Sequence, residues 1–386
     1  MNKAIVLAWC VLLVVCVSGC TGMSLYTEYR ELDEIEPVQV IGLDFTDEIV
    51  TASLASGASM DGNPPIRMLS SANTVRRALA DMQQFSAPKH VMFSHVQYYL
   101  IGEEAARSGM RRYVDYIERA MEVEQNTTIY VVRGGPAADA VINAGDDQTS
   151  VVDLLKSHSD DVKEAESCNT CSIMDITENL ERNGCTLVGA IQLIEEPDIV
   201  TGTSKSTIAS AGYAVIRGET LLSFIDKQNI NGINIVTNQM GTDIVEADDT
   251  QGSMGAFRII GTKTDVKSYF NGDKIERIDL NIKVKADIEE LENEINLYDT
   301  DVIRGLEDNI SGLVLKCTEA AVEGAQILKT DYLFIGEKIE IAHPVKFAKI
   351  KNEWHDIFGE LNITVNITTD IERTYDIGDP MPRRQE

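Results

Sequence analysis

The chain has 386 residues, and its 62 acidic side chains outnumber its 34 basic ones, which gives a formal net charge of −28. Such a surface repels phosphates and anionic headgroups, so it argues against a nucleic-acid-binding protein. With 44% hydrophobic and 25% charged residues, the composition is that of a globular chain long enough for two or three domains.

The chain begins with the three parts of a secretory signal peptide. Lys3 supplies a positive charge, residues 4–17 form an uncharged and mostly apolar run, and small residues follow. A membrane-spanning helix needs about 20 apolar residues, and this run has only 14. We therefore predict a signal peptide at residues 1–19.

The signal peptide ends in four residues that match the bacterial lipobox, namely Val17, Ser18, Gly19 and Cys20. The small residues let the chain enter the peptidase that cuts before Cys20, whose thiol takes a diacylglyceryl group as a thioether. Two acyl chains give stable attachment, because each buried methylene contributes about 0.8 kcal/mol. The sequence predicts lipid attachment at Cys20, and the alternatives are a chance cysteine after an ordinary signal peptide or a short uncleaved anchor.

Residues 20–200 are predicted to form an N-terminal α+β region in which strands and helices alternate, with a possible subdomain boundary near residues 135–145. The expected strands lie at residues 38–45, 48–55, 91–101, 127–132 and 187–194. The expected helices lie at residues 71–84 and 103–122, and a polar helical stretch covers residues 137–184.

Residues 201–386 are predicted to form a C-terminal domain in which an antiparallel sheet packs on a long helix. The expected strands lie at residues 209–216, 221–225, 256–260, 278–288 and 361–371, and the helices at 300–328 and 344–358. The clearest strand alternates Ile278, Leu280 and Ile282 with polar residues, which is typical of a strand with one face on a core. The long helix carries one apolar stripe that suits a sheet face. The fold class is therefore α+β.

No catalytic or metal-binding motif is found in the sequence, and neither a metal nor a cofactor is predicted. His90 and His95 are expected on opposite faces of one strand because their offset is odd, so they are poorly placed to share a metal. The acidic residues 246–249 are predicted to form a solvated turn, and weak attraction of a cation is the alternative. No catalytic residue is proposed.

Four cysteines follow the lipobox, at positions 168, 171, 185 and 317. The spacing of Cys168 and Cys171 fits a redox pair or half of a zinc site, but no second pair with suitable spacing follows. A disulfide between Cys185 and one of the two is a further alternative in an exported chain. A structural or incidental role is favoured for all four.

Several segments together resemble one protein family in their order and spacing. They are residues 30–32 with 41–44, residues 95–104 with 106–109, residues 211–215 with 221–222, and a C-terminal series that begins at Asp331. The family positions matched within them include Gly42, Asp44, His95, Gly102, Gly336, Pro344, Trp354 and Phe358. The set resembles the Ger(x)C lipoproteins, the C subunits of bacterial spore nutrient-germinant receptors.

The resemblance implies a non-enzymatic, three-domain α+β lipoprotein on the outer face of the spore inner membrane. Its partners would be the membrane, through the N-terminal lipid, and two polytopic receptor subunits. The first rival is an extracytoplasmic substrate-binding lipoprotein of a transporter, but such a protein has two α/β lobes, and the second half here is predicted to be antiparallel. An extracytoplasmic hydrolase is the second rival, and it lacks an identifiable nucleophile and base.

Overall fold

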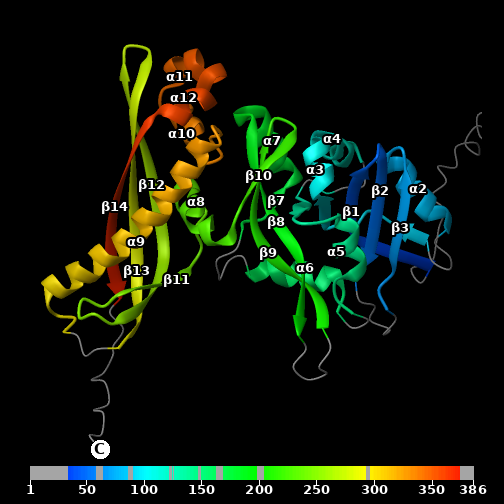
Figure 1. The fold of residues 1–386 in the computed structure, drawn as a ribbon, viewed down its shortest axis with the longest axis horizontal. Helices are drawn as coiled ribbons and strands as arrows, with labels where there is room; N and C mark the ends of the chain where they lie inside the picture. Colours follow the sequence, from blue (N-terminus) through cyan, green and yellow to red (C-terminus); the bar gives the residue numbers. More distant parts are fainter. Residues whose placement is uncertain are drawn as a thin grey trace, which may run out of the picture.

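The chain folds into two β-sheets that lie beside each other along the longest axis of the molecule (Figure 1). The computed structural model describes residues 34–57, 64–85, 90–120, 124, 126–146, 149–161, 168–197, 204–292 and 296–373. The predicted signal peptide and Cys20 lie outside the described residues. Among the described residues, no helix combines the length and apolar character that crossing a bilayer requires.

The first sheet has ten strands in the order β10-β9-β8-β6-β5-β1-β2-β3, with β4 beside β1 and β7 beside β6. Its strands are β1 (Ile35–Thr46), β2 (Ile49–Ser56), β3 (Arg67–Ala72), β4 (His90–Met92), β5 (Tyr98–Gly102), β6 (Thr128–Val132), β7 (Cys171–Ser172), β8 (Cys185–Pro197), β9 (Ser204–Arg217) and β10 (Thr220–Ile225). The central strands β1, β5, β6 and β8 run parallel to their neighbours in this group. Their carboxyl ends therefore lie along one edge of the sheet.

Helices cover both faces of the first sheet, as a parallel centre requires. They are α2 (Val75–Phe85), α3 (Glu103–Gly109), α4 (Arg111–Arg119), α5 (Ala137–Asn143), α6 (Val151–Asp161) and α7 (Ile173–Asn183). One buried core contains side chains of α2, α3, α4 and α7, and a second core contains those of α5 and α6. The central strands are consequently buried on both sides.

The second sheet has four strands in the order β11-β12-β13-β14. These are β11 (Asp243–Asp248), β12 (Met254–Asn271), β13 (Lys274–Leu291) and β14 (Asn362–Arg373). The helical elements of this half are η2 (Lys227–Asn229), α8 (Ile230–Thr237), α9 (Thr300–Ile327), α10 (Ile335–Ala342), α11 (Pro344–Ile350), η3 (Lys351–Glu353) and α12 (Trp354–Glu360). In Figure 1 the long helix α9 lies across this sheet.

The predicted α+β fold class is confirmed, and so are its two clearest elements. The alternating residues of β13, from Ile278 to Ala286, are at most 1% exposed. Leu306, Ile310 and Val314 of α9 share a buried core with β13 side chains. The sequence pattern therefore identified the buried face of β13 and the buried face of α9, which pack on each other.

Two strands predicted for the C-terminal antiparallel sheet belong to the first sheet instead. The predicted strands at 209–216 and 221–225 lie in β9 and β10, and β9 pairs along β8 from Cys185 to Pro197. This pairing satisfies the edge of β8 that would otherwise be open. The first sheet thus continues past residue 200, and the domain boundary placed there stays a prediction.

The prediction of a fully antiparallel second sheet is wrong for its last strand. β14 runs parallel to β13 over residues 362–373. The helices from α9 to α12 carry the chain back to the starting end of the sheet, and such a crossover connection joins parallel strands.

Other predicted elements are interrupted in the structure. The expected strand at residues 91–101 is divided into β4 and β5, so His90 and His95 do not share a strand. The expected helix at residues 103–122 is broken at Gly109, whose φ of +141° does not fit a helix.

The acidic residues 246–249, predicted to form a solvated turn, complete a strand and begin a turn. Residues up to Asp248 belong to β11, and Asp249 is fully buried. Its carboxylate accepts hydrogen bonds from the backbone N–H groups of Gln251 and Ser253 at 2.9 and 3.0 Å. The carboxylate is buried because the turn supplies its donors.

Candidate functional site

The first cluster of family-motif residues lies near the carboxyl ends of β1, β5 and β6. The Asp44 carboxylate accepts hydrogen bonds from the backbone N–H groups of Ala137 and Ala138 at 2.7 and 2.8 Å. These groups begin α5 and have no partner within the helix, so Asp44 caps the helix from a neighbouring strand. Burial raises the pKa of Asp44, and both hydrogen bonds act against that rise.

Two glycines make room for this cap. A Cβ atom on Gly102 would lie 1.9 Å from Asp44 Oδ1. A Cβ atom on Gly42 would lie 2.3 Å from Ser53 Oγ and 3.0 Å from a methyl group of Val141 in α5. A larger residue at either position would displace these side chains, so the two glycines allow Asp44 and α5 to lie close to the sheet.

The second cluster is centred on the buried carboxylate of Asp331. Its Oδ1 accepts a hydrogen bond from Ile335 N at 3.1 Å, while Oδ2 accepts from Gly336 N at 2.6 Å and from Trp354 Nε1 at 2.7 Å. The two backbone donors begin α10, so one side chain caps this helix and holds the indole. Burial raises the pKa of Asp331, and the three donors oppose that effect.

The indole of Trp354 is enclosed by motif residues. A Cβ atom on Gly336 would lie 2.4 Å from Trp354 Nε1, so only glycine leaves space for the ring here. Phe347 and Phe358 flank the indole, with ring centroids 5.3 and 5.9 Å away. Pro344 begins α11, where the missing N–H group of proline is not needed.

His355 connects this cluster to the first sheet. Its Nδ1 accepts a hydrogen bond from Asp331 N at 3.2 Å, and its Nε2 lies 2.9 Å from the carbonyl oxygen of Asn183, the last residue of α7. This pattern requires a proton on Nε2 and none on Nδ1, which is the neutral imidazole. Burial lowers the pKa of His355, in agreement with that form.

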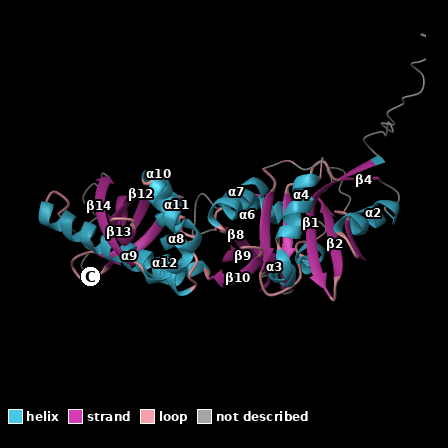
Figure 2. Cartoon of the chain, turned by 90° about the horizontal axis from the view of Figure 1, so that it is seen from above, coloured by secondary structure: helices cyan, strands magenta, loops and turns pink. Residues whose placement is uncertain are grey.

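Further polar contacts join the first sheet to the C-terminal half around Asp331 and His355. We call this region the junction. Cys185 Sγ lies 3.4 Å from the carbonyl oxygen of Asp331, and Arg182 forms an ion pair with Glu337 at 2.9 Å. The Tyr213 hydroxyl donates to Asn234 Oδ1 at 2.7 Å. Figure 2 shows α7 and β8 next to α8, α10 and α11.

The junction also contains a continuous apolar core. Side chains from the first sheet share this core with side chains of α8, α9, α10, α12 and β13. Its buried members include Leu187, Tyr213, Val215, Ile230, Ile233, Ile278, Ala321, Leu333, Ile339, Trp354 and Phe358. A hydrophobic interface of this kind holds two structural units in a fixed relation.

The remaining candidates from the sequence lie apart from these clusters or are inert. His95 is exposed in the segment between β4 and β5. Cys168, Cys171 and Cys185 are buried free thiols, and burial raises the pKa of each, that of Cys168 to about 11. Thiols in this state are poor nucleophiles and metal ligands. Within the described part of the chain, no group of three or more His, Cys, Asp or Glu side chains is arranged to hold a metal.

Sequence reasoning missed several junction residues. Asn169, Tyr213 and Asn234 form a hydrogen-bonded group across the two halves, and no local motif marks them. Asp331 was indicated by the C-terminal family series, but its capping role was not, although an aspartate shortly before an apolar helix is typical of a cap. The partnership of His355 with Asn183 had no such signal.

The folded chain is thus an α+β protein of two sheets in which motif carboxylates and glycines fix helices and join the halves. A family model described as "Spore germination protein N-terminal domain" matches residues 28–193, and one described as "Spore germination B3/ GerAC like, C-terminal" matches residues 211–375. The chain belongs to this spore germination family of GerAC-like proteins.

Two individual proteins are similar to the chain. Spore germination protein YndF of Bacillus subtilis (strain 168) is 24% identical over 171 residues, which are 43% of this chain and 42% of YndF. The matched segment therefore spans less than half of that relative. The crystal structure of the GerBC protein has a TM-score of 0.58 and 19% identity, and the match covers 86% of this chain and 97% of that one. This second similarity shows a shared fold.

We predict that Gly336→Ala destabilises the folded chain. The added methyl group would displace Trp354 from Asp331, and overpacking plus a lost buried hydrogen bond costs about 2 to 4 kcal/mol. Urea unfolding followed by tryptophan fluorescence measures the change. Gly312→Ala in α9 is the matched control, because open space surrounds this glycine, and alanine there should raise stability by up to about 1 kcal/mol. Equal unfolding midpoints for Gly336→Ala and the unaltered chain would contradict the prediction.

Lowering the pH is predicted to weaken the junction through His355. The pKa of this imidazole in the folded chain is below its ordinary value of 6.5, so the unfolded chain binds the proton first as the pH falls. The stability from neutral His355 is therefore complete above about pH 6.5 and is lost as the pH falls through the folded-state pKa. A protonated Nδ1 can no longer accept from Asp331 N.

The measurement compares unfolding free energies at about pH 7.5 and about pH 5.5, on either side of the ordinary histidine pKa. His355→Gln should show a smaller loss between these conditions than the unaltered chain. An identical loss in both proteins would show that His355 is not the responsible group.

Proposed function

We propose that the chain is the lipid-anchored, non-enzymatic C subunit of a spore nutrient-germinant receptor. In this role it assembles with polytopic membrane subunits on the outer face of the spore inner membrane, and it is needed for germination in response to nutrients. Membership of a spore germination family over residues 28–193 and 211–375 supports the proposal.

The main structural support for the proposal is that the motif carboxylates are buried and cap helices. Asp44 and Asp331 are 7% and 3% exposed, and each accepts hydrogen bonds from N–H groups that begin a helix. The recess that Asp331 borders has a volume of only about 40 Å³, far below the size of a small-molecule binding pocket. Residues of this kind fix the shape of a body, which is what an assembly subunit requires.

The apolar core of the junction argues against the alternative function, that of a transporter's substrate-binding lipoprotein. Such a protein closes two lobes around its ligand, so the lobes must move apart. Here Leu187 and Tyr213 of the first sheet pack in one core with Leu333 and Trp354 of the C-terminal half. Opening the two halves would expose this core, and the receptor subunit is therefore the favoured function.

Lipid attachment at Cys20 completes the proposal. An acyl anchor confines the chain to the membrane plane, which raises its effective concentration near membrane partners without tight direct contacts. The acidic surface, with a net charge of −28, has little attraction for anionic lipid. The anchor thus supplies the membrane affinity that the charged surface does not.

We predict that a palmitate probe labels the chain in cells and that Cys20→Ala abolishes the labelling. The thioether forms only on this thiol, so the variant should also leave the membrane fraction, which fractionation and immunoblotting can measure. Cys317→Ala is a suitable control because this thiol lies in α9 of the C-terminal half. A labelled Cys20→Ala chain would contradict lipid attachment at this residue.

Deletion of the gene is predicted to slow germination in a nutrient while leaving vegetative growth normal. A germination receptor acts on spores, so the loss should appear as a slower fall in optical density after nutrient is added. A treatment that germinates spores without nutrient receptors provides a control for general viability. Normal nutrient germination across all nutrients tested would contradict the proposed function.

A further inference from the structure

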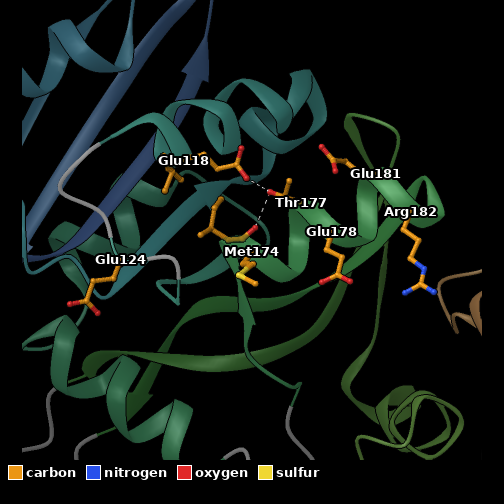
Figure 3. Close-up of a pocket in the computed structure, with 9 residues that line it drawn as sticks. Glu118, Glu124, Met174, Thr177, Glu178, Glu181 and Arg182 are labelled. Carbon is orange, nitrogen blue, oxygen red and sulfur yellow. Dashed lines mark hydrogen bonds between the residues drawn. The ribbon is translucent and has the colours of Figure 1, made fainter.

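A groove with a volume of about 560 Å³ lies between α4 and α7 beside the first sheet (Figure 3). Its floor includes Ile117 of α4 and Ile173 of α7, which are 1% and 2% exposed. Met174 also lines the groove and is 56% exposed. A flexible, polarizable methionine on an apolar floor adapts to side chains of different shape, as in many protein-binding grooves.

The rim of the groove is acidic. Glu118, Glu124, Glu178 and Glu181 line it, and all four are exposed. No cation in the described part of the chain forms an ion pair with Glu124, Glu178 or Glu181. The rim therefore presents negative charge that is free to attract an external cation.

Arg182, the one cation among the described residues that line the groove, does not neutralise this rim. Its guanidinium pairs with Glu337 at 2.9 Å and lies 3.7 Å from Glu340, both in α10. Figure 3 shows this side chain extending away from Glu118 and Thr177. The charge of Arg182 is thus balanced by the glutamates of α10 at the junction.

We propose that this groove is the docking site for a basic amphipathic segment of a partner protein. Such a segment places one or two apolar side chains on the floor beside Met174 and its lysines or arginines against the rim. The proposal rests on the proposed function only in supposing that the chain has protein partners. It adds a location and a chemical character to the interaction.

Charge and shape favour this occupant over others. Anionic lipid and nucleic acid are repelled by the four glutamates. A second copy of a chain with a net charge of −28 is repelled as a whole. A small cation alone would use the rim but leave Met174 exposed to water, whereas an amphipathic segment contacts the rim and also covers Met174.

The test uses the full acylated chain in detergent and a fluorescent amphipathic peptide of leucine and lysine, about 15 residues long so that it can form a helix. Fluorescence anisotropy measures binding. The same peptide with glutamate in place of lysine is the control ligand, and it should not bind.

The test variant is Glu178→Gln with Glu181→Gln. Two exposed ion pairs contribute little each, so we expect the lysine peptide to bind about three- to tenfold more weakly. The matched control is Glu319→Gln with Glu323→Gln, an exposed pair on α9 that makes the same change in net charge. This control should leave the affinity within about twofold, because screening limits its effect over distance.

A third variant, Met174→Lys, places a cation on the floor and should weaken binding by at least as much as the double variant. Circular dichroism checks that each protein folds, which is expected because the changed side chains are exposed. Equal weakening by both glutamate pairs would reveal non-specific attraction and overturn the proposal. So would the absence of binding by the lysine peptide, or a self-associated chain that the groove variants dissociate.

These outcomes are independent of the germination phenotype. A chain that fails to support nutrient germination in cells can still bind the lysine peptide, and this would reject the proposed function alone. Normal germination with no groove binding would reject the docking site alone.

Discussion

The buried carboxylate of Asp331 is the contact on which the joining of the two sheets depends. A carboxylate that leaves water is costly unless hydrogen-bond donors replace its hydration, and here Ile335, Gly336 and Trp354 supply three. The same residue offers its backbone N–H group to His355, which reaches the first sheet. Removing the carboxylate would leave three buried donors without an acceptor, so the parts of this network depend on one another.

The first sheet uses the same device at Asp44. Helices α5 and α10 have seven and eight residues, and helices this short are marginal by themselves. In each, a carboxylate from outside the helix binds the first N–H groups, and a nearby glycine, Gly102 or Gly336, leaves the space it needs. Asp44 and Asp331 thus stabilise short helices through tertiary contacts, which explains why these two carboxylates are buried.

The sequence predicted those elements whose burial pattern is local. Strand β13 and helix α9 each bury one face whatever their neighbours are, so the residues from Ile278 to Ala286 revealed the strand directly. The direction of β14 and the membership of β9 depend on which sheet edges are open, and a single segment carries no information on that. The segment at residues 91–101 differs from the predicted strand because the chain turns at residues 94–95, where Val96 N bonds to Phe93 O. The stretches on either side, β4 and β5, both pair with β1.

In the candidate sites, too, the sequence indicated single residues but not the contacts between distant segments. Sequence similarity indicated Gly336 and Trp354, but the hydrogen bond between His355 and Asn183 joins residues 172 positions apart. The groove is equally non-local, since Ile117 and Met174 come from separate helices. Met174 lies at the start of α7, and Asn183 ends it, about 14 Å along one helix at 1.5 Å per residue. Any displacement of α7 by a segment bound in the groove would therefore also move the carbonyl group that holds His355, so the proposed docking site and the junction share one rigid element.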